Sequence, residues 1–201
     1  MARVIVYVDG FNLYYGQCKG RIGRRWLDLG ALASRLRPQD EIACIRYFSA
    51  WVKGPSQAIR QNVYVRALRT IPVLTDHMSY FSMKPTWMPQ VDRSLPDVEV
   101  LKTQEKGSDV NLATYLLLDG ADGCFEEAVV ISNDQDLTLP VQRTRERVGP
   151  VHVVAPNNQP GTDLEVAAST YSRLFPSYVR QCQFPDPMTD AAGVFHKPAD
   201  W

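Results

Sequence analysis

The run Val4-Ile5-Val6-Tyr7-Val8, near the start of the chain, decides the fold class. Its residues are nearly all apolar and mostly β-branched, and Asp9-Gly10 follows directly. A short apolar run of this kind is typical of a strand that is buried on both faces of a parallel sheet. We therefore expect residues 3–8 to form the first strand of an α/β domain.

Beyond this strand, the sequence alternates between strand and helix patterns. We expect strands over residues 42–51, 73–83, 98–102, 128–132 and 151–154. Helical patterns cover residues 11–15, 27–36, 109–118, 137–147 and 162–168, and another begins at Pro55 and ends before Pro72. Alternation of this kind predicts a three-layer α/β/α architecture around a mainly parallel central sheet.

Two stretches interrupt the alternation. Residues 84–96 contain three prolines, which predicts an irregular loop with a functional role. From Pro176 onward prolines recur and the periodicity is lost. We expect one domain over residues 1–175 and a proline-containing tail over residues 176–201, extended or disordered.

Composition limits the classes of function. The chain of 201 residues has 22 basic and 22 acidic side chains, so it has no bulk attraction for polyanions, and any nucleic-acid site must be a local patch. Its four cysteines form no C-x-x-C pair, which favours reduced thiols. We see no secretion signal and no apolar stretch of bilayer length, and we expect a cytoplasmic protein.

Acidic residues occupy equivalent places in this pattern. Asp9 ends the first strand, Asp109 opens a helix, and Asp134 and Asp136 follow the strand at 128–132. Sites in open parallel sheets form at the carboxyl ends of the strands, so these acids can meet there. Clustered carboxylates repel unless a cation neutralises them, and hard oxygen ligands favour Mg²⁺ or Mn²⁺ over zinc. Such an ion generates hydroxide from water for attack on a phosphodiester.

Each acid also has a purely structural interpretation. Asp109 is equally well placed to cap its helix, and Asp134 and Asp136 suit the start of the helix at Leu137. Asp9-Gly10 suits a turn in which Asn12 bonds to the backbone. The coincidence of these acids at strand ends is harder to explain by capping and turns alone.

Three segments carry a resemblance to a known family. Residues 8–13 (Val-Asp-Gly-Phe-Asn-Leu), 106–110 (Lys-Gly-Ser-Asp-Val) and 131–137 (Ile-Ser-Asn-Asp-Gln-Asp-Leu) resemble the signature segments of the NYN domain family, which belongs to the PIN-like nucleases. The resemblance extends in arrangement over residues 3–154. It implies a PIN-like, Rossmann-like fold and a metal-dependent ribonuclease whose Mg²⁺ or Mn²⁺ ligands are Asp9, Asp109, Asp134 and Asp136.

The same segments suggest substrate-binding residues. By the resemblance, Asn12 would orient substrate or a metal-bound water, and Lys106 would neutralise a phosphate oxygen. A solvated surface lysine is an equally good interpretation of Lys106. Ser132 is placed to donate a hydrogen bond to phosphate or to a carboxylate.

A basic loop follows the Asp9 segment. Arg24 and Arg25 lie beside Trp26, a combination that can hold backbone phosphate and stack a base. Tyr14 and Tyr15 are further stacking candidates, although packing is the commoner role of such aromatic residues.

These observations predict endonucleolytic cleavage of single-stranded RNA by a metal-activated water. The alternative is a catalytically silent RNA-binding or assembly module with the same fold. Toprim-like phosphotransfer enzymes would need an early glutamate where this chain has Asp9, and haloacid-dehalogenase-type phosphatases would need an acid where it has Phe11. The sequence leaves open whether two chains associate or a protein partner binds.

Overall fold

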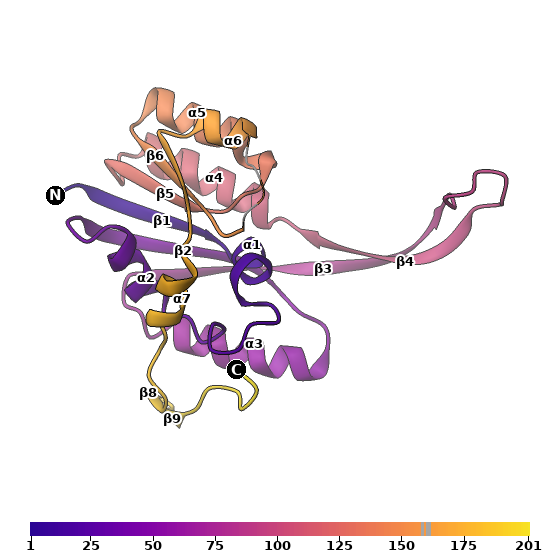
Figure 1. Ribbon diagram of the computed structural model, residues 1–201, viewed down its shortest axis with the longest axis horizontal. Coiled ribbons are helices and arrows are strands. Elements are labelled where there is room, and N and C mark those ends of the chain that lie inside the picture. The colour runs from indigo at the N-terminus through magenta and orange to yellow at the C-terminus, as the bar shows by residue number, and fades with distance from the viewer. Residues whose placement is uncertain (158, 160–161) are drawn as a thin grey trace.

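The computed structural model describes residues 1–157, 159 and 162–201. Within these residues the main sheet has seven strands in the order β4-β3-β2-β1-β5-β6-β7 (Figure 1). The neighbouring strands are parallel except β3 and β4, which run antiparallel. The predicted α/β fold with a mainly parallel central sheet is confirmed.

The strands of the main sheet are β1 (Arg3–Asp9), β2 (Glu41–Trp51), β3 (Leu74–Met88), β4 (Val98–Lys106), β5 (Glu127–Ile131), β6 (Val151–Ala155) and β7 (Thr170–Arg173). The helices are α1 (Gly10–Leu13), α2 (Leu29–Leu36), α3 (Pro55–Leu68), α4 (Ser108–Ala121), α5 (Thr138–Arg147), α6 (Thr162–Ala167) and α7 (Pro176–Gln181). A π-helical turn, η1 (Tyr14–Cys18), continues α1, and a 3₁₀ turn, η2 (Gln135–Leu137), precedes α5. None of the helices in the described part of the chain has the length and apolar character needed to cross a bilayer.

The side chains of β1 alternate between two cores. Val4, Val6 and Val8 pack into the cluster under α2, α3 and α7, whereas Ile5 and Tyr7 pack into the cluster under α4, α5 and α6. Figure 1 shows these two groups of helices on opposite sides of the sheet. The central strand is therefore apolar throughout because both of its faces are covered.

The segment predicted as an irregular loop is instead part of a long β-hairpin. β3 and β4 pair from Tyr80 opposite Lys106 to Met88 opposite Val98, and together they project from the body of the domain (Figure 1). β2 pairs with β3 only as far as Tyr80, so beyond that residue each strand of the hairpin has a free edge. A proline such as Pro85 is tolerated there because the missing N–H can fall on the unpaired side.

The C-terminal segment is folded, which differs from the extended or disordered tail expected for residues 176–201. It forms α7 and a small hairpin of β8 (Met188–Asp190) and β9 (Gly193–Phe195). Phe184 and Phe195 are buried and pack edge-on against Trp26. The prolines break the helical and strand periods, but the apolar residues between them still cover one side of the core.

Candidate metal centre

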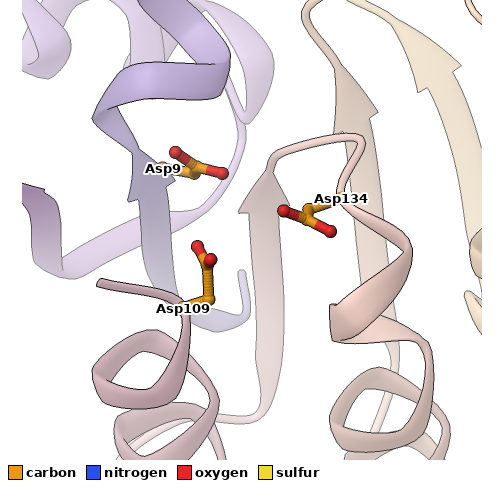
Figure 2. Close-up of side chains that lie close together, drawn as sticks. All are labelled: Asp9, Asp109 and Asp134. Atoms are coloured by element: carbon orange, nitrogen blue, oxygen red, sulfur yellow. The ribbon is translucent and has the colours of Figure 1, made fainter. Parts of the chain in front are cut away.

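Carboxylates from three separate segments meet at the carboxyl edge of the sheet. Asp9 ends β1, Asp109 lies in the first turn of α4, and Asp134 lies in the loop after β5. Oxygen atoms of the three side chains all lie within 4.8 Å of one another. Figure 2 shows the carboxylates directed toward a common centre. The parallel pairing of β1 with β5 brings the ends of these strands side by side.

Asp9 is the most deeply placed of the three, with 5% of its surface exposed. One carboxylate oxygen accepts hydrogen bonds from the Asn12 amide (2.9 Å), and the other accepts from the Ser132 hydroxyl (2.9 Å). Burial raises the pKa of Asp9, although these hydrogen bonds oppose the shift. Asp9 therefore has a fixed orientation that suits a ligand.

The close packing around Gly10 explains why a glycine follows Asp9. A Cβ at this position would lie 2.7 Å from the hydroxyl oxygen of Tyr47 and 2.8 Å from the carbonyl oxygen of Phe48. A larger residue would push α1 away from β2, so the Asp-Gly pair keeps Asp9 at the edge of the sheet.

Asp109 faces the other two acids from the start of α4. The N-cap of this helix is Gly107, whose φ of 100° lies in the left-handed region that favours glycine, so Asp109 is not the capping residue. Burial, followed by the charges of Asp9 and Asp134, raises the pKa of Asp109 to about 6. The acids are therefore close enough to repel one another.

Asp134 combines a structural role with a place in the cluster. It caps η2 by accepting a hydrogen bond from the Asp136 amide (3.0 Å), as its capping interpretation predicted. Its own amide donates to the hydroxyl of Ser132 (3.1 Å), which in turn donates to Asp9. Ser132 is fully buried, so its hydroxyl connects two of the acids and is not free to contact phosphate.

The structure separates the other predicted residues. Asn12 lies at the cluster and accepts a hydrogen bond from the Asn133 amide (3.1 Å). Asp136 is exposed and lies outside the group of three carboxylates. Lys106 is exposed at the end of β4, where its ammonium group donates to Gln104 (3.1 Å).

The residues of the basic loop, Arg24, Arg25 and Trp26, do not line the hollow at the acids. Trp26 is 3% exposed, and its indole N–H donates to the carbonyl of Pro185 (3.1 Å), so it cannot stack a base. Arg24 donates to the side chain of Gln17 (3.3 Å), and Arg25 lines a different hollow from the one at the acids. This prediction was wrong for Trp26 because an isolated tryptophan in sequence carries no information on which face of the fold it covers.

A hollow of about 380 Å³ surrounds the three acids. We name it the acid cleft and define it by its polar residues and the rings at its rim: Asp9, Asn12, Asp109, Asp134, Glu105, Ser108, Phe11, Tyr15 and Phe81. Its carboxylates lie beside aromatic side chains, a combination that offers both metal ligands and stacking surfaces.

Glu105 and Ser108 are among the residues of the acid cleft that the sequence did not predict. Glu105 accepts a hydrogen bond from the Ser108 amide (3.1 Å), and its charge contributes to the raised pKa of Asp109. Ser108 is 3% exposed, and its hydroxyl has no hydrogen-bond partner among the described residues. Strand alternation continued to residue 106 would have placed Glu105 on the same face of the hairpin as Phe81, its partner in the register.

The donor set fits a hard divalent cation. Three carboxylates from different elements, one with a strongly raised pKa, need positive charge between them when all are ionised. Oxygen donors of this kind suit Mg²⁺ or Mn²⁺.

Known proteins resemble the chain at different levels. It is 28% identical over 201 residues to 6-hydroxy-3-succinoylpyridine 3-monooxygenase HspA of Pseudomonas putida, a match that covers 81% of this chain. The chain spans 63% of the length of that relative. A protein of unknown function from Vibrio parahaemolyticus, VPA0982, superposes with a TM-score of 0.58 at 17% identity over 87% of this chain and 93% of its own. At that identity the likeness shows the fold alone.

The match to a family is more extensive. The sequence profile of the NYN domain covers residues 3–175, which include Asp9, Asp109 and Asp134. The chain therefore belongs to the NYN domain family, whose fold is that of the PIN-like nucleases.

Proposed function

We propose that this chain is a divalent-metal-dependent ribonuclease that cuts single-stranded RNA within the strand, at the acid cleft. The observation that carries the proposal is the approach of Asp9, Asp109 and Asp134 to within 4.8 Å of one another. Membership of the NYN family supports a nuclease class of enzyme.

The three acids would hold Mg²⁺ or Mn²⁺. When bound, the ion would supply an activated water and neutralise the charge that develops on the phosphate. Ser132 and Asn12 fix the carboxylates and the loop around them through hydrogen bonds. Ser108 lines the acid cleft beside Asp109, and its buried hydroxyl has no hydrogen-bond partner among the described residues.

Two residues at the margin have weaker roles. The negative charge of Asp136 contributes to the raised pKa of Asp109. Asp136 would bind the ion only through water, because it lies outside the group of three carboxylates. Lys106 would contact a phosphate of the strand beyond the cleft, since it is exposed at the base of the hairpin.

The rim of the acid cleft favours an unpaired strand. Phe11 and Phe81 pack edge-on with ring centroids 5.6 Å apart, and Tyr15 is 58% exposed beside them. Unpaired bases can stack on such rings, whereas the bases of a duplex cannot reach them. We place this activity in the cytoplasm, where the four free cysteines would stay reduced.

The test is cleavage of labelled single-stranded RNA with Mg²⁺ or Mn²⁺, beside EDTA and the Asp134→Asn variant. Asp122→Asn is a matched control, because Asp122 is exposed at the opposite end of α4. We expect cleavage by wild type and by the control only. RNA bound but left intact by the wild type would instead favour the catalytically silent RNA-binding module.

A second candidate is oxidation of a small aromatic acid, the kind of reaction named for the Pseudomonas putida relative. It is favoured by a second hollow, of about 280 Å³ and lined by aromatic rings, which adjoins the acid cleft. Incubation with 6-hydroxy-3-succinoylpyridine, oxygen and a nicotinamide reductant would test it. A hydroxylated product, with RNA left intact, would replace the ribonuclease proposal.

A further inference from the structure

A second hollow adjoins the acid cleft at the α1–η1 segment. We name it the aromatic pocket and define it by its six rings, Phe11, Tyr14, Tyr15, Tyr47, Tyr64 and Trp201. Its volume is about 280 Å³, near the lower end of the range of small-molecule sites, roughly 300–1,000 Å³. Phe11 and Tyr15 line both hollows.

The rings come from elements on several sides of the aromatic pocket. Tyr14 and Tyr15 belong to η1, Tyr47 to β2 and Tyr64 to α3, and the end of the chain lies beside α3 in Figure 1. They pack on one another, with centroids 5.4 Å apart for Tyr14 and Tyr15 and 5.8 Å apart for Tyr64 and Trp201. Walls of this kind favour a flat aromatic ligand, which gains stacked or edge-on contacts.

Cationic side chains also line the aromatic pocket. The ammonium group of Lys19 lies 4.5 Å from the centre of the Tyr15 ring, and Arg60 pairs with Asp200 at 2.6 Å. Arg25 differs from both, because its Nε is buried and has no hydrogen-bond partner among the described residues. Because none of the described residues provides an acceptor for this N–H, the guanidinium group of Arg25, which lines the pocket, would pair with an anionic group there.

We propose that the aromatic pocket binds a single planar aromatic ring that carries an anionic group, with the ring between the aromatic walls and the anion at Arg25. Two sources offer this chemistry. One is a nucleotide of an RNA strand that passes Phe11 and Tyr15 from the acid cleft, a case that rests on the proposed ribonuclease. The other is a free aromatic acid.

The experiment is calorimetric titration of the full chain in EDTA, so that neither cleavage nor metal bridging contributes. The probes are uridine 5′-monophosphate, uridine, ribose 5-phosphate and 6-hydroxy-3-succinoylpyridine. They present ring and anion together, the ring alone, the anion alone, and ring and anion without a sugar. We expect the two probes with both features to bind at least tenfold more tightly than uridine or ribose 5-phosphate.

Variants locate the binding. Arg25→Gln removes the charge and leaves a shorter polar side chain, and we expect it to weaken binding of the anionic ring probes at least tenfold. Arg21→Gln is the matched control from the same loop, because Arg21 is exposed and does not line the pocket. Tyr14→Ala removes a partly exposed ring and should weaken the ring probes even if Arg25→Gln fails to fold.

The outcomes separate this inference from the proposed function. Failure of both anionic ring probes to bind at millimolar concentration would overturn it, as would equal binding by the wild type, Arg25→Gln and Tyr14→Ala proteins. Tighter binding of the nucleotide identifies the RNA strand as the source, and tighter binding of the pyridine identifies a free acid. Loss of RNA cleavage alone would leave the pocket intact, because the titration contains no metal.

Discussion

The acid cleft and the aromatic pocket share Phe11 and Tyr15 but differ in nearly everything else. The acid cleft holds three carboxylates, and burial, followed by the charges of Asp9 and Asp134, raises the pKa of Asp109 to about 6. The aromatic pocket holds rings and a buried arginine nitrogen without a partner among the described residues. Among the described residues, carboxylates and no cationic side chains line the acid cleft, whereas Lys19, Arg25 and Arg60 line the aromatic pocket, so the two suit different parts of a ligand.

The wall between them is one short segment of sequence. α1 carries Phe11 and Asn12, and the π-helical turn η1 carries Tyr14 and Tyr15. π-Helical turns are rare and recur at functional sites, because the wider turn changes the direction of successive side chains. Here it allows neighbouring residues to line two hollows of opposite character.

The largest effect is expected from a substitution that removes a carboxylate of the acid cleft and leaves the aromatic pocket unchanged. Asp9→Asn removes a buried carboxylate that accepts hydrogen bonds from both Ser132 and Asn12. We expect Mn²⁺ affinity to fall at least about 100-fold, because loss of a ligand should exceed the loss caused by its hydrogen-bonding partners. Manganese titration measures this, and an unchanged affinity would contradict the assignment. Probe binding to the aromatic pocket in EDTA should stay within twofold of wild type.

A smaller effect is expected at Ser132, which connects two of the acids. Ser132→Ala leaves the carboxylates in place but removes the hydroxyl that donates to Asp9 and accepts from the Asp134 amide. We expect a decrease of about 10- to 100-fold in metal affinity or cleavage. Ser132→Thr, which keeps the hydroxyl, is the control. Equal losses in both variants would point to packing rather than to hydrogen bonding.

The pH dependence of the free energy of unfolding should change on substitution of Asp109 in the acid cleft and not on substitution of Arg25 in the aromatic pocket. The pKa of Asp109 is raised in the folded chain, so its favourable contribution to folding is fully present below pH 4 and is lost as pH rises through 6. In EDTA at pH 7.5, Asp109→Asn should therefore be more stable than wild type by about 1 kcal/mol, or 2–4 °C in Tm.

Thermal scans check this at two pH values. At pH 5 the difference between Asp109→Asn and wild type should shrink, and saturating Mg²⁺ at pH 7.5 should reverse it by stabilising only the wild type. Arg25→Gln should show no comparable pH dependence. A variant less stable than wild type at pH 7.5 without metal would contradict a raised pKa of Asp109 in the folded chain.

The smallest effect is expected at Asp136, which the resemblance placed among the ligands. Because Asp136 is exposed and outside the group of three, Asp136→Asn should reduce metal affinity only about twofold to threefold, through the loss of a screened charge. The same titration as for Asp9→Asn measures this. A loss as large as that of Asp9→Asn would show that Asp136 enters the coordination shell directly.

Much of the fold could be predicted because its signals are local. The apolar run at residues 4–8 and the alternation of strand and helix patterns predicted the parallel sheet correctly. The hairpin of β3 and β4 was only partly predicted. The prolines in residues 84–96 indicate a loop when the strand with which this segment pairs is not known. The C-terminal segment was not predicted, because Phe184 and Phe195 show no period and are buried through tertiary contacts such as those with Trp26.

The sequence by itself determined that Asp9, Asp109 and Asp134 would lie at strand ends or helix starts, because local pattern places each residue within its own element. Only the tertiary structure decided that these three meet while Asp136 remains outside: Asp134 precedes η2 as its N-cap, whereas Asp136 lies within the turn and is exposed. It also decided that Trp26 is core and that Arg25 faces a ring-lined pocket. These outcomes depend on contacts between segments distant in the sequence, such as those of Asp9 with Asp134 and of Trp26 with Phe184, and no local period of a sequence records them.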